Sequence, residues 1–158
     1  DGVFGGYTIA QNVVIEGAKG GSGDDVLIGN DARNRLQGGG GADVLFGGAK
    51  GDLLYGGGGA DTFIFGEEDS THGKANRDVI FDFSAANDVI DVSGIDAIAG
   101  TEADDAFVLV TGAFTGAGQI RIVTSGEDTL ILGSTDADAA AEFELLLKGD
   151  VDGIDFVL

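Results

Sequence analysis

Apolar side chains recur at every ninth position between residues 20 and 64, and most residues between them are glycine or polar. Five segments of the 158-residue chain align in register there: GGSGDDVLI (20–28), GNDARNRLQ (29–37), GGGGADVLF (38–46), GGAKGDLLY (47–55) and GGGGADTFI (56–64). We interpret each segment as a glycine-rich turn followed by a strand of about three residues. The eighth residue of each segment should point into the core: Leu27, Leu36, Leu45, Leu54 and Phe63.

Two such segments predict a coil of about 18 residues, because one turn and one strand complete half a circuit of a flattened right-handed helix of parallel strands. Successive turns then alternate between two edges of the roll. The turns 20–25, 38–43 and 56–61 should stack at one edge, and the turns 29–34 and 47–52 at the other. The sixth residues therefore form two columns: Asp25, Asp43 and Asp61 in the first, and Asn34 and Asp52 in the second.

The rest of the chain predicts further short strands. Residues 1–19 read as an N-terminal cap with strands near 7–10 and 13–15, and residues 65–77 as a polar loop. Residues 143–147 (FELLL) are ambiguous, because the preceding DADAAAE favours a helix start whereas a strand suits a β-sandwich better. Other runs of β-branched and aromatic residues predict the strands Val79–Phe83, Asp88–Val92, Phe107–Val110, Gln119–Val123 and Thr129–Leu132.

These patterns together predict an all-β fold, in which a right-handed parallel β-roll of nonapeptide repeats continues into a C-terminal β-sandwich. Because the chain contains no proline, glycine, asparagine and aspartate have to form its turns. We expect a single domain over residues 1–158, with the cap at 1–19, the repeats at 20–64 and the closing β-sandwich at 65–158.

The repeat has the composition of a calcium-binding turn. Glycine lets the backbone adopt positive φ where a Cβ would clash, and such a turn directs carbonyl oxygens toward a cation. The aspartate in the sixth place adds a carboxylate, so all the ligands are oxygen, which suits a hard cation such as Ca²⁺. The spacing is that of the calcium-binding nonapeptide G-G-x-G-x-D-x-U-x of RTX proteins.

The second column departs from this pattern in two places. Asn34 is neutral, and Lys50 replaces the glycine in the fourth place of its turn. A lysine carbonyl can still bind a cation, provided that the ammonium group points to solvent. Past the repeats, Asp69 and Asp78 are each one residue short of continuing a column. We expect Asp69 to follow Asp52, and Asp78 to close the first column.

The charge of the chain predicts a need for bound cations. The chain contains 28 acidic and 8 basic residues, for a formal charge of −20, together with 30 glycines. Self-repulsion and the entropy of ordering glycine both oppose folding, and Ca²⁺ would relieve both. The same acidity argues against nucleic acid and anionic membranes as partners. No apolar run reaches the ~18 residues of a membrane-spanning helix, so we expect no membrane insertion.

The scarcity or absence of certain residue types excludes several kinds of metal and catalytic site. Cysteine is absent, which excludes disulfides and thiolate metal sites. The only histidine, His72, cannot supply the three protein ligands of a catalytic zinc ion. No spacing of carboxylates singles out a catalytic pair, so we expect no enzymatic activity from this chain by itself. The chain begins Asp-Gly-Val and contains no methionine, so we expect it to be a fragment of a longer protein.

Several stretches outside and across the repeats resemble the C-terminal domain of the serralysin family, secreted bacterial zinc metalloproteases with an RTX β-roll. YTIAQNVVIEGAKGGSGDDVLIGN is similar to the entry into that roll, and ADTFIFG, followed by DST and RDVIFDF, to its exit. NDVIDVSGID, GAFTGAGQIRI and the terminal IDFVL are similar to its closing β-sandwich and carboxyl end. The resemblance covers nearly the whole chain.

This resemblance implies a calcium-dependent folding and type I secretion module of an extracellular metalloprotease. It implies an N-terminal zinc protease domain in the parent protein, and a C-terminus read by the type I secretion apparatus. Residues 153–158, acidic and then apolar, suit such a signal, although a last sheet strand explains them equally well. The resemblance also implies several Ca²⁺ ions, roughly four to six. Their ligands would be carbonyls and side chains of Gly21, Gly23, Asp25, Asn30, Ala32, Asn34, Gly38, Gly39, Gly41, Asp43, Gly47, Gly48, Lys50, Asp52, Gly56, Gly57, Gly59, Asp61, Asp69 and Asp78.

Two other functions stay open at this point. The first is an alginate- or polysaccharide-binding R-module of a secreted epimerase or lyase, in which the same kind of roll occurs. Such a module needs a groove for an acidic polymer, and Arg33 and Arg35, close together in one repeat, could form part of one. The second is a spacer in an adhesin, which would require further repeats upstream.

Overall fold

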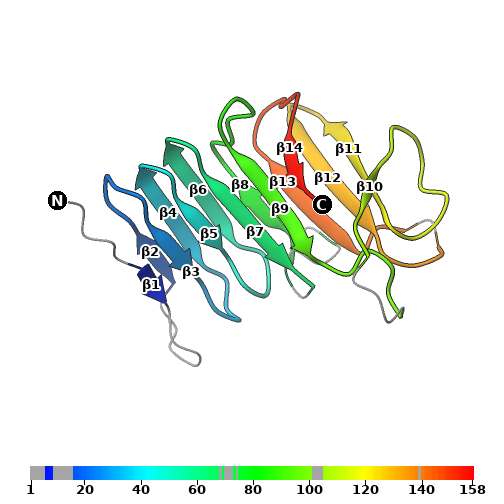
Figure 1. The fold of residues 1–158 in the computed structure, drawn as a ribbon, viewed down its shortest axis with the longest axis horizontal. Coiled ribbons are helices and arrows are strands. Elements are labelled where there is room, and N and C mark those ends of the chain that lie inside the picture. The colour runs from blue at the N-terminus through cyan, green and yellow to red at the C-terminus, as the bar shows by residue number, and fades with distance from the viewer. Residues whose placement is uncertain are drawn as a thin grey trace.

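The computed structural model consists of β-strands and connecting turns in the residues that it describes, which are 6–8, 16–67, 69, 73, 75–100, 105–138 and 140–158. Two sheets form the molecule, and the coils advance along it from the N-terminal end, blue in Figure 1, toward the C-terminal end. These residues include no helix of the length and apolarity needed to cross a membrane. The predicted all-β class and the parallel β-roll are confirmed.

The first sheet has six strands, and all neighbouring strands run parallel. Its order is β1 (Gly6–Thr8), β3 (Val26–Ile28), β5 (Val44–Phe46), β7 (Thr62–Gly66), β9 (Val89–Gly94) and β14 (Asp155–Val157). Within the roll the chain leaves this sheet after each strand and returns to it one coil later.

The second sheet has eight strands and is mixed, with both parallel and antiparallel neighbours. Its order is β10 (Val108–Leu109), β11 (Gln119–Ser125), β12 (Asp128–Ser134), β13 (Phe143–Leu147), β8 (Asp78–Ile80), β6 (Leu53–Gly58), β4 (Arg35–Gly40) and β2 (Gly17–Lys19). From β2 to β13 the neighbours are parallel, whereas β11, β12 and β13 pair antiparallel. The antiparallel strands belong to the closing C-terminal region.

Strand register follows the repeat, in steps of 18 residues. Val26 pairs with Val44, and Val44 with Thr62, while Arg35 pairs with Leu53 in the other sheet. The side chains in the eighth place of the repeat point between the sheets, and each is fully buried. They are Leu27, Leu36, Leu45, Leu54 and Phe63. Full burial of one such side chain contributes about 1.5–3 kcal/mol, so this ladder is the core of the roll.

A few segments differ from the sequence prediction. Residues 143–147 form a strand, because they are hydrogen-bonded between β12 and β8 and all five are buried. The strand expected at 7–10 corresponds to β1, and the one expected at 13–15 lies outside the described residues. β2 was not predicted, and β7 continues to Gly66, where we expected a loop. The other expected strands correspond to β8, β9, β10, β11 and β12, with ends that differ by a few residues.

Candidate metal sites in the stacked turns

The residues in the sixth place of successive turns stack in two columns, as the repeat predicts. In the first column, the backbone N–H of Asp25 donates to Oδ1 of Asp43 at 2.8 Å, and that of Asp43 donates to Oδ1 of Asp61 at 2.9 Å. Each accepting carboxylate thus reaches the main chain of the coil before it. Oδ1 of Asp43 therefore joins its coil to the coil of Asp25, and Oδ1 of Asp61 joins its coil to the coil of Asp43.

The second column is built in the same way but ends differently from the prediction. The N–H of Asn34 donates to Oδ1 of Asp52 at 2.7 Å, and the N–H of Asp52 donates to Oδ1 of Asp78 at 2.6 Å. The prediction that Asp78 continues the first column is therefore wrong. The coil from Asp52 to Asp78 is 26 residues long instead of 18, because β7 and β8 are farther apart in the sequence than consecutive strands of the repeats, and the longer coil brings Asp78 to this edge.

Asp69 lies at the edge of the second column, as expected, but Asp78 and not Asp69 follows Asp52 in that column. Asp69 forms an isolated parallel bridge with Lys50, in the turn that ends at Asp52. Its Oδ2 accepts a hydrogen bond from the N–H of Gly66 at 2.6 Å, and it is buried. The second edge of the roll therefore collects three carboxylates, those of Asp52, Asp69 and Asp78.

The first column ends on two aspartates that the sequence prediction missed. Oδ1 of Asp88 accepts from the N–H of Asp61 at 3.0 Å, and its Oδ2 accepts from the N–H of Ser84 at 2.8 Å. Asp82 accepts from the N–H groups of Gly56 and Gly57, at 2.9 and 3.1 Å. The signal that could have found Asp88 is its place directly before the apolar strand β9, which is the place that the repeat aspartates take before their strands.

The second carboxylate oxygens in the columns are the feature that points to a ligand. Oδ2 of Asp43, of Asp52 and of Asp61 is buried, and within the described residues none of the three accepts a hydrogen bond. Leaving a buried polar group unpaired costs about 1–3 kcal/mol, and more for a charged group. These oxygens therefore fit a bound cation, which would supply the missing partner.

Glycine in the first place of each turn leaves the space that these oxygens occupy. An ideal Cβ built on Gly38 would lie 2.2 Å from Oδ2 of Asp43, and one on Gly56 would lie 2.3 Å from Oδ2 of Asp61. The same relationship holds at the other edge, where a Cβ on Gly47 would lie 2.3 Å from Oδ2 of Asp52. A side chain at these positions would displace the carboxylate.

The predicted carbonyl ligands lie in the same stacked turns as the aspartates. A Cβ on Gly39 would lie 2.2 Å from the carbonyl oxygen of Gly21, and one on Gly59 would lie 1.8 Å from that of Gly41. Carbonyl groups of one turn thus point at the next turn. Lys50 adopts a φ of 72°, and Gly41 and Gly59, in the same place of their turns, also have positive φ. The first edge holds Gly21, Gly23, Asp25, Gly38, Gly39, Gly41, Asp43, Gly56, Gly57, Gly59 and Asp61; the second holds Asn30, Ala32, Asn34, Gly47, Gly48, Lys50, Asp52, Asp69 and Asp78.

Burial of these carboxyl groups changes their proton affinity. It raises the pKa of Asp43 and of Asp61, and it raises the pKa of Asp52 to about 7. The pKa of Asp78 is raised well above its usual range for the same reason. Main-chain hydrogen bonds oppose these shifts, and neighbouring carboxylates such as Asp69 add to them. A cation in the columns would reverse the effect, because it favours the charged form.

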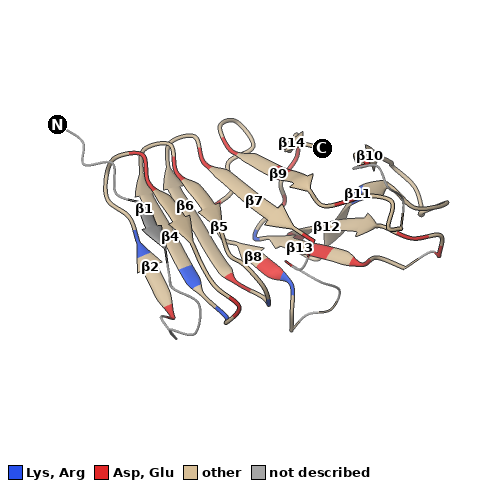
Figure 2. Cartoon of the chain, turned by 60° about the horizontal axis from the view of Figure 1, so that its bottom comes forward, with Lys and Arg blue, Asp and Glu red and all other residues tan. Residues whose placement is uncertain are grey.

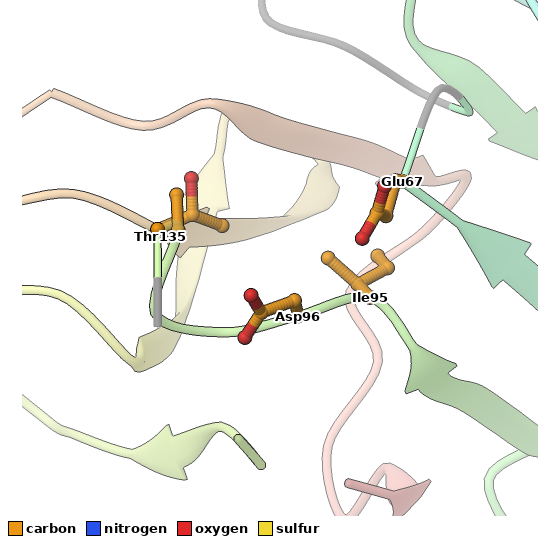
Figure 3. Close-up of a pocket in the computed structure, with 6 residues that line it drawn as sticks. Glu67, Ile95, Asp96 and Thr135 are labelled. Atoms are coloured by element: carbon orange, nitrogen blue, oxygen red, sulfur yellow. The ribbon is translucent and has the colours of Figure 1, made fainter. Parts of the chain in front are cut away.

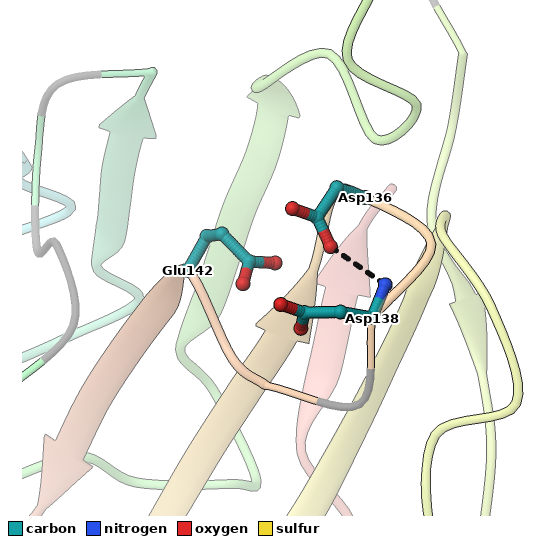
Figure 4. Close-up of side chains that lie close together, drawn as sticks. All are labelled: Asp136, Asp138 and Glu142. Carbon is teal, nitrogen blue, oxygen red and sulfur yellow. Dashed lines mark hydrogen bonds between the residues drawn. The ribbon is translucent and has the colours of Figure 1, made fainter.

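A separate acidic cluster lies in the closing region and was not predicted. Asp136, Asp138 and Glu142 bring carboxylate oxygens within 4.8 Å of one another (Figure 4). Asp136 accepts from the N–H of Asp138 at 2.9 Å, and Glu142 accepts from the N–H of Thr135 at 2.8 Å. These bonds shape an exposed loop, and they account for the arrangement without a ligand.

A cavity of about 340 Å³ lies between the end of β7 and the loop after β9 (Figure 3). Glu67, Ile95, Asp96 and Thr135 are among the residues that line it. Oδ1 of Asp96 accepts from the N–H of Ile98 at 3.1 Å, so this carboxylate serves to hold its own loop. The cavity contains none of the predicted site residues.

The fold and the columns define a parallel β-roll module with stacked acidic turns. Residues 1–108 match the family model described as Peptidase M10 serralysin C terminal, and the chain therefore belongs to the serralysin C-terminal domain family.

Relatives named as metalloproteases agree with this assignment, and a solved structure of another protein has a similar fold. The chain is 53% identical over 133 residues to metallopeptidase AprA of Pseudomonas marginalis, covering 79% of this chain and 28% of the relative. It is 48% identical over 162 residues to metalloprotease AprA of Pseudomonas entomophila, covering 99% of this chain and 32% of the relative. The chain thus spans about a third of the length of these relatives. The solution structure of the AlgE6R3 subunit from the Azotobacter vinelandii mannuronan C5-epimerase is similar, with 28% identity and a TM-score of 0.60, over 91% of this chain and 78% of that one.

Proposed function

We propose that this chain is the calcium-dependent folding and type I secretion module of an extracellular, serralysin-like metalloprotease. The observation that carries the proposal is the set of buried Oδ2 atoms of Asp43, Asp52 and Asp61, which stack in register without a hydrogen-bond donor in the described structure. Their neighbours are carbonyl oxygens and glycine main chain, so the ligand set is all oxygen and suits Ca²⁺.

Each aspartate has two roles in this proposal. Its Oδ1 accepts from the main chain of the preceding coil, as Asp43 does from Asp25, and its Oδ2 is left for the cation. The carbonyls of the turn glycines would complete the ligands at each step. Bound calcium supplies positive charge that offsets the repulsion between stacked carboxylates and joins neighbouring turns.

The expected energies favour cooperative folding. Calcium sites of extracellular modules typically have a Kd of about 10⁻⁴–10⁻³ M. At a few-fold excess of calcium, mass action then contributes about 1 kcal/mol per site. Several such sites reach a domain stability of about 5–15 kcal/mol only if they act together. The stacked turns supply that coupling, because each contacts its neighbours and none is complete alone.

The secretion role follows from the same dependence on calcium. At the low calcium of the cell interior, a chain with a charge of −20 and 30 glycines would stay unfolded and fit for export. Outside the cell, calcium would fold it. We assign the C-terminal signal to residues 153–158, where β14 pairs with β9 at the edge of the first sheet. The remaining length of the relatives would hold the zinc protease domain.

Circular dichroism of the chain in EDTA and in millimolar calcium, with magnesium as the control cation, tests this function. We expect a cooperative gain of β-structure with calcium and little with magnesium, whose small ion demands tighter octahedral geometry. A chain that keeps the same spectrum and the same melting temperature after exhaustive dialysis against EDTA would contradict the proposal.

A second candidate function is binding of an acidic polysaccharide. It is favoured by the 28% identity and TM-score of 0.60 to a subunit of a mannuronan epimerase. The family assignment places the chain with metalloproteases, so we retain only the binding role and not the epimerase itself. Binding of this kind is compatible with calcium-dependent folding.

A further inference from the structure

The outward face of the second sheet carries an unusual grouping of basic and aromatic residues. Strand register places Arg35 beside Leu53 in one row and Gln37 beside Tyr55 in the next, with Lys19 next to Gln37. The residues between these rows, such as Leu36 and Leu54, point into the core and are fully buried. The row residues therefore face solvent on the outside of β2, β4 and β6.

Positive charge is concentrated here although the chain as a whole is strongly acidic. Figure 2 shows basic residues on β2 and β4, whereas acidic residues dominate the turns and the closing region. Arg77 and Lys148 are neutralised by ion pairs with Glu144 and Asp128. In the described part of the chain, Arg33 and Arg35 have no such ion pair. They are therefore available to an anionic group from outside.

Arg35 is held in place by stacking. Its guanidinium carbon lies 4.7 Å from the centre of the Tyr55 ring, and that ring stacks on Phe81 with centroids 4.6 Å apart and planes 8° apart. Stacking occupies the face of the guanidinium and leaves its N–H edge for hydrogen bonds. An ordered guanidinium edge is the donor that matches a carboxylate through two parallel hydrogen bonds.

A groove of about 430 Å³ opens next to this arginine. Its lining combines the two arginines with apolar and acceptor groups: Glu16, Ala32, Arg33, Asn34, Arg35 and Leu53. A simple inorganic anion would be attracted by the arginines but repelled by the exposed carboxylate of Glu16. A sugar acid suits the whole lining, because its carboxylate would meet the arginines while its hydroxyl groups donate to Glu16 and its ring covers Leu53.

We propose that this groove binds a polyuronate, an extended polysaccharide with one carboxylate on each sugar, through Arg33 and Arg35. A polyuronate is also less densely charged than nucleic acid, which has one charge per ≈1.7 Å of duplex, so it is repelled less by an acidic chain. The inference deepens the second candidate function. It also rests on calcium-dependent folding, because Arg33 and Arg35 flank Asn34 in the second column.

Calorimetric titration of the calcium-loaded chain with short mannuronate oligomers tests the site. Saturable binding is expected, and Arg33→Gln and Arg35→Gln should each weaken it about tenfold or more, as for loss of a hydrogen bond to a charged group. Arg35→Lys, which keeps the charge but loses the planar edge, should also weaken it. Arg121→Gln is the matched control, because Arg121 stacks on Phe114 at the same 4.7 Å but lies on β11.

Circular dichroism of each sample separates the two proposals. A folded, calcium-loaded chain that binds no oligomer, or variants at Arg33 and Arg35 that bind as the parent does, would overturn the polyuronate site and leave calcium-dependent folding intact. Equal binding of polyaspartate would also overturn it, since the groove would then select charge and not sugar. Loss of folding in the parent chain at saturating calcium would instead remove the function on which the site depends.

Discussion

Oδ1 of Asp78 accepts a hydrogen bond from the backbone N–H of Asp52 at 2.6 Å, although the two residues are 26 positions apart and the steps within the repeats are 18 residues long. The additional residues lie between β7 and β8, while β6 and β8 still pair in parallel, with Leu53 opposite Val79. Asp78 therefore ends the second column in place of a repeat aspartate.

Replacing Asp78 by alanine should destabilise the calcium-loaded chain by at least about 1–3 kcal/mol, since the N–H of Asp52 would lose its acceptor in a buried site. Chemical denaturation at saturating calcium measures this loss. Asp152→Ala changes the charge equally at an exposed position and is the control. Similar stability of the two variants would show that the contact between Asp52 and Asp78 does not hold the coil.

Asp43→Ala should weaken calcium-dependent folding more than Asp25→Ala. Oδ1 of Asp43 ties the neighbouring coil through Asp25, and its Oδ2 faces the proposed cation. Asp25 accepts from Gly21 in its own turn, and within the described residues its side chain accepts from no other coil. The calcium concentration at the folding midpoint should be about tenfold higher for Asp43→Ala than for Asp25→Ala. This ratio corresponds to the free energy of one hydrogen bond to a charged group. Calcium titrations followed by circular dichroism test it, and equal midpoints would argue against ions shared between turns.

The roll could be predicted from the sequence because the residues that determine the turn and the strand lie within each repeat. Glycine, aspartate and one apolar residue recur at fixed places, so the spacing alone sets the strand register and the inward ladder of residues such as Leu45. The same regularity predicted both columns up to Asp61 and Asp52. The prediction stopped being reliable at the point where the period of nine ends.

What could not be predicted depends on contacts between distant segments. Residues 67–77 have no repeat period, so the sequence does not indicate which column Asp78 joins, and the pattern around Asp88 predicts only the start of a strand. Residues 143–147 are strand because β12 and β8 lie on either side of them, and local propensity contains no information on those neighbours. The groove beside Arg35 likewise needs the ring of Tyr55 from the next coil.

The glycine in the first place of a turn should be far less tolerant of substitution than the glycine in the third place, such as Gly58. Gly38→Ala would place its Cβ 2.2 Å from Oδ2 of Asp43 and 2.6 Å from the carbonyl oxygen of Gly56. We expect a loss of about 1–3 kcal/mol from this overpacking. At Gly58 nothing lies within 4 Å of the added Cβ, so Gly58→Ala should change stability by less than about 0.5 kcal/mol. Chemical denaturation in calcium compares the stability of the two variants. An equally small loss of stability in Gly38→Ala would contradict the close contact between Gly38 and Oδ2 of Asp43.

Removal of calcium should leave a fold that depends on pH through the buried carboxyl groups. Burial raises the pKa of Asp52 from 3.8 to about 7, so between these values the folded state binds a proton that the unfolded state has released. Stability without metal should therefore fall as pH rises through this window, and it should be lowest above pH 7.

Circular dichroism in EDTA between about pH 5 and pH 8 measures this dependence, with β-structure expected to increase toward the acidic end. In the Asp52→Asn variant the side chain at position 52 no longer titrates. The circular dichroism spectrum of this variant in EDTA should therefore change less with pH than that of the parent chain. Asp152→Asn, exposed to solvent, should behave as the parent does. In the presence of calcium the pH dependence should have the opposite direction, because protons compete with the cation for the same oxygens. The calcium concentration at the folding midpoint should therefore fall as pH rises. A spectrum in EDTA that gains β-structure toward alkaline pH would show that buried carboxyl groups do not control folding.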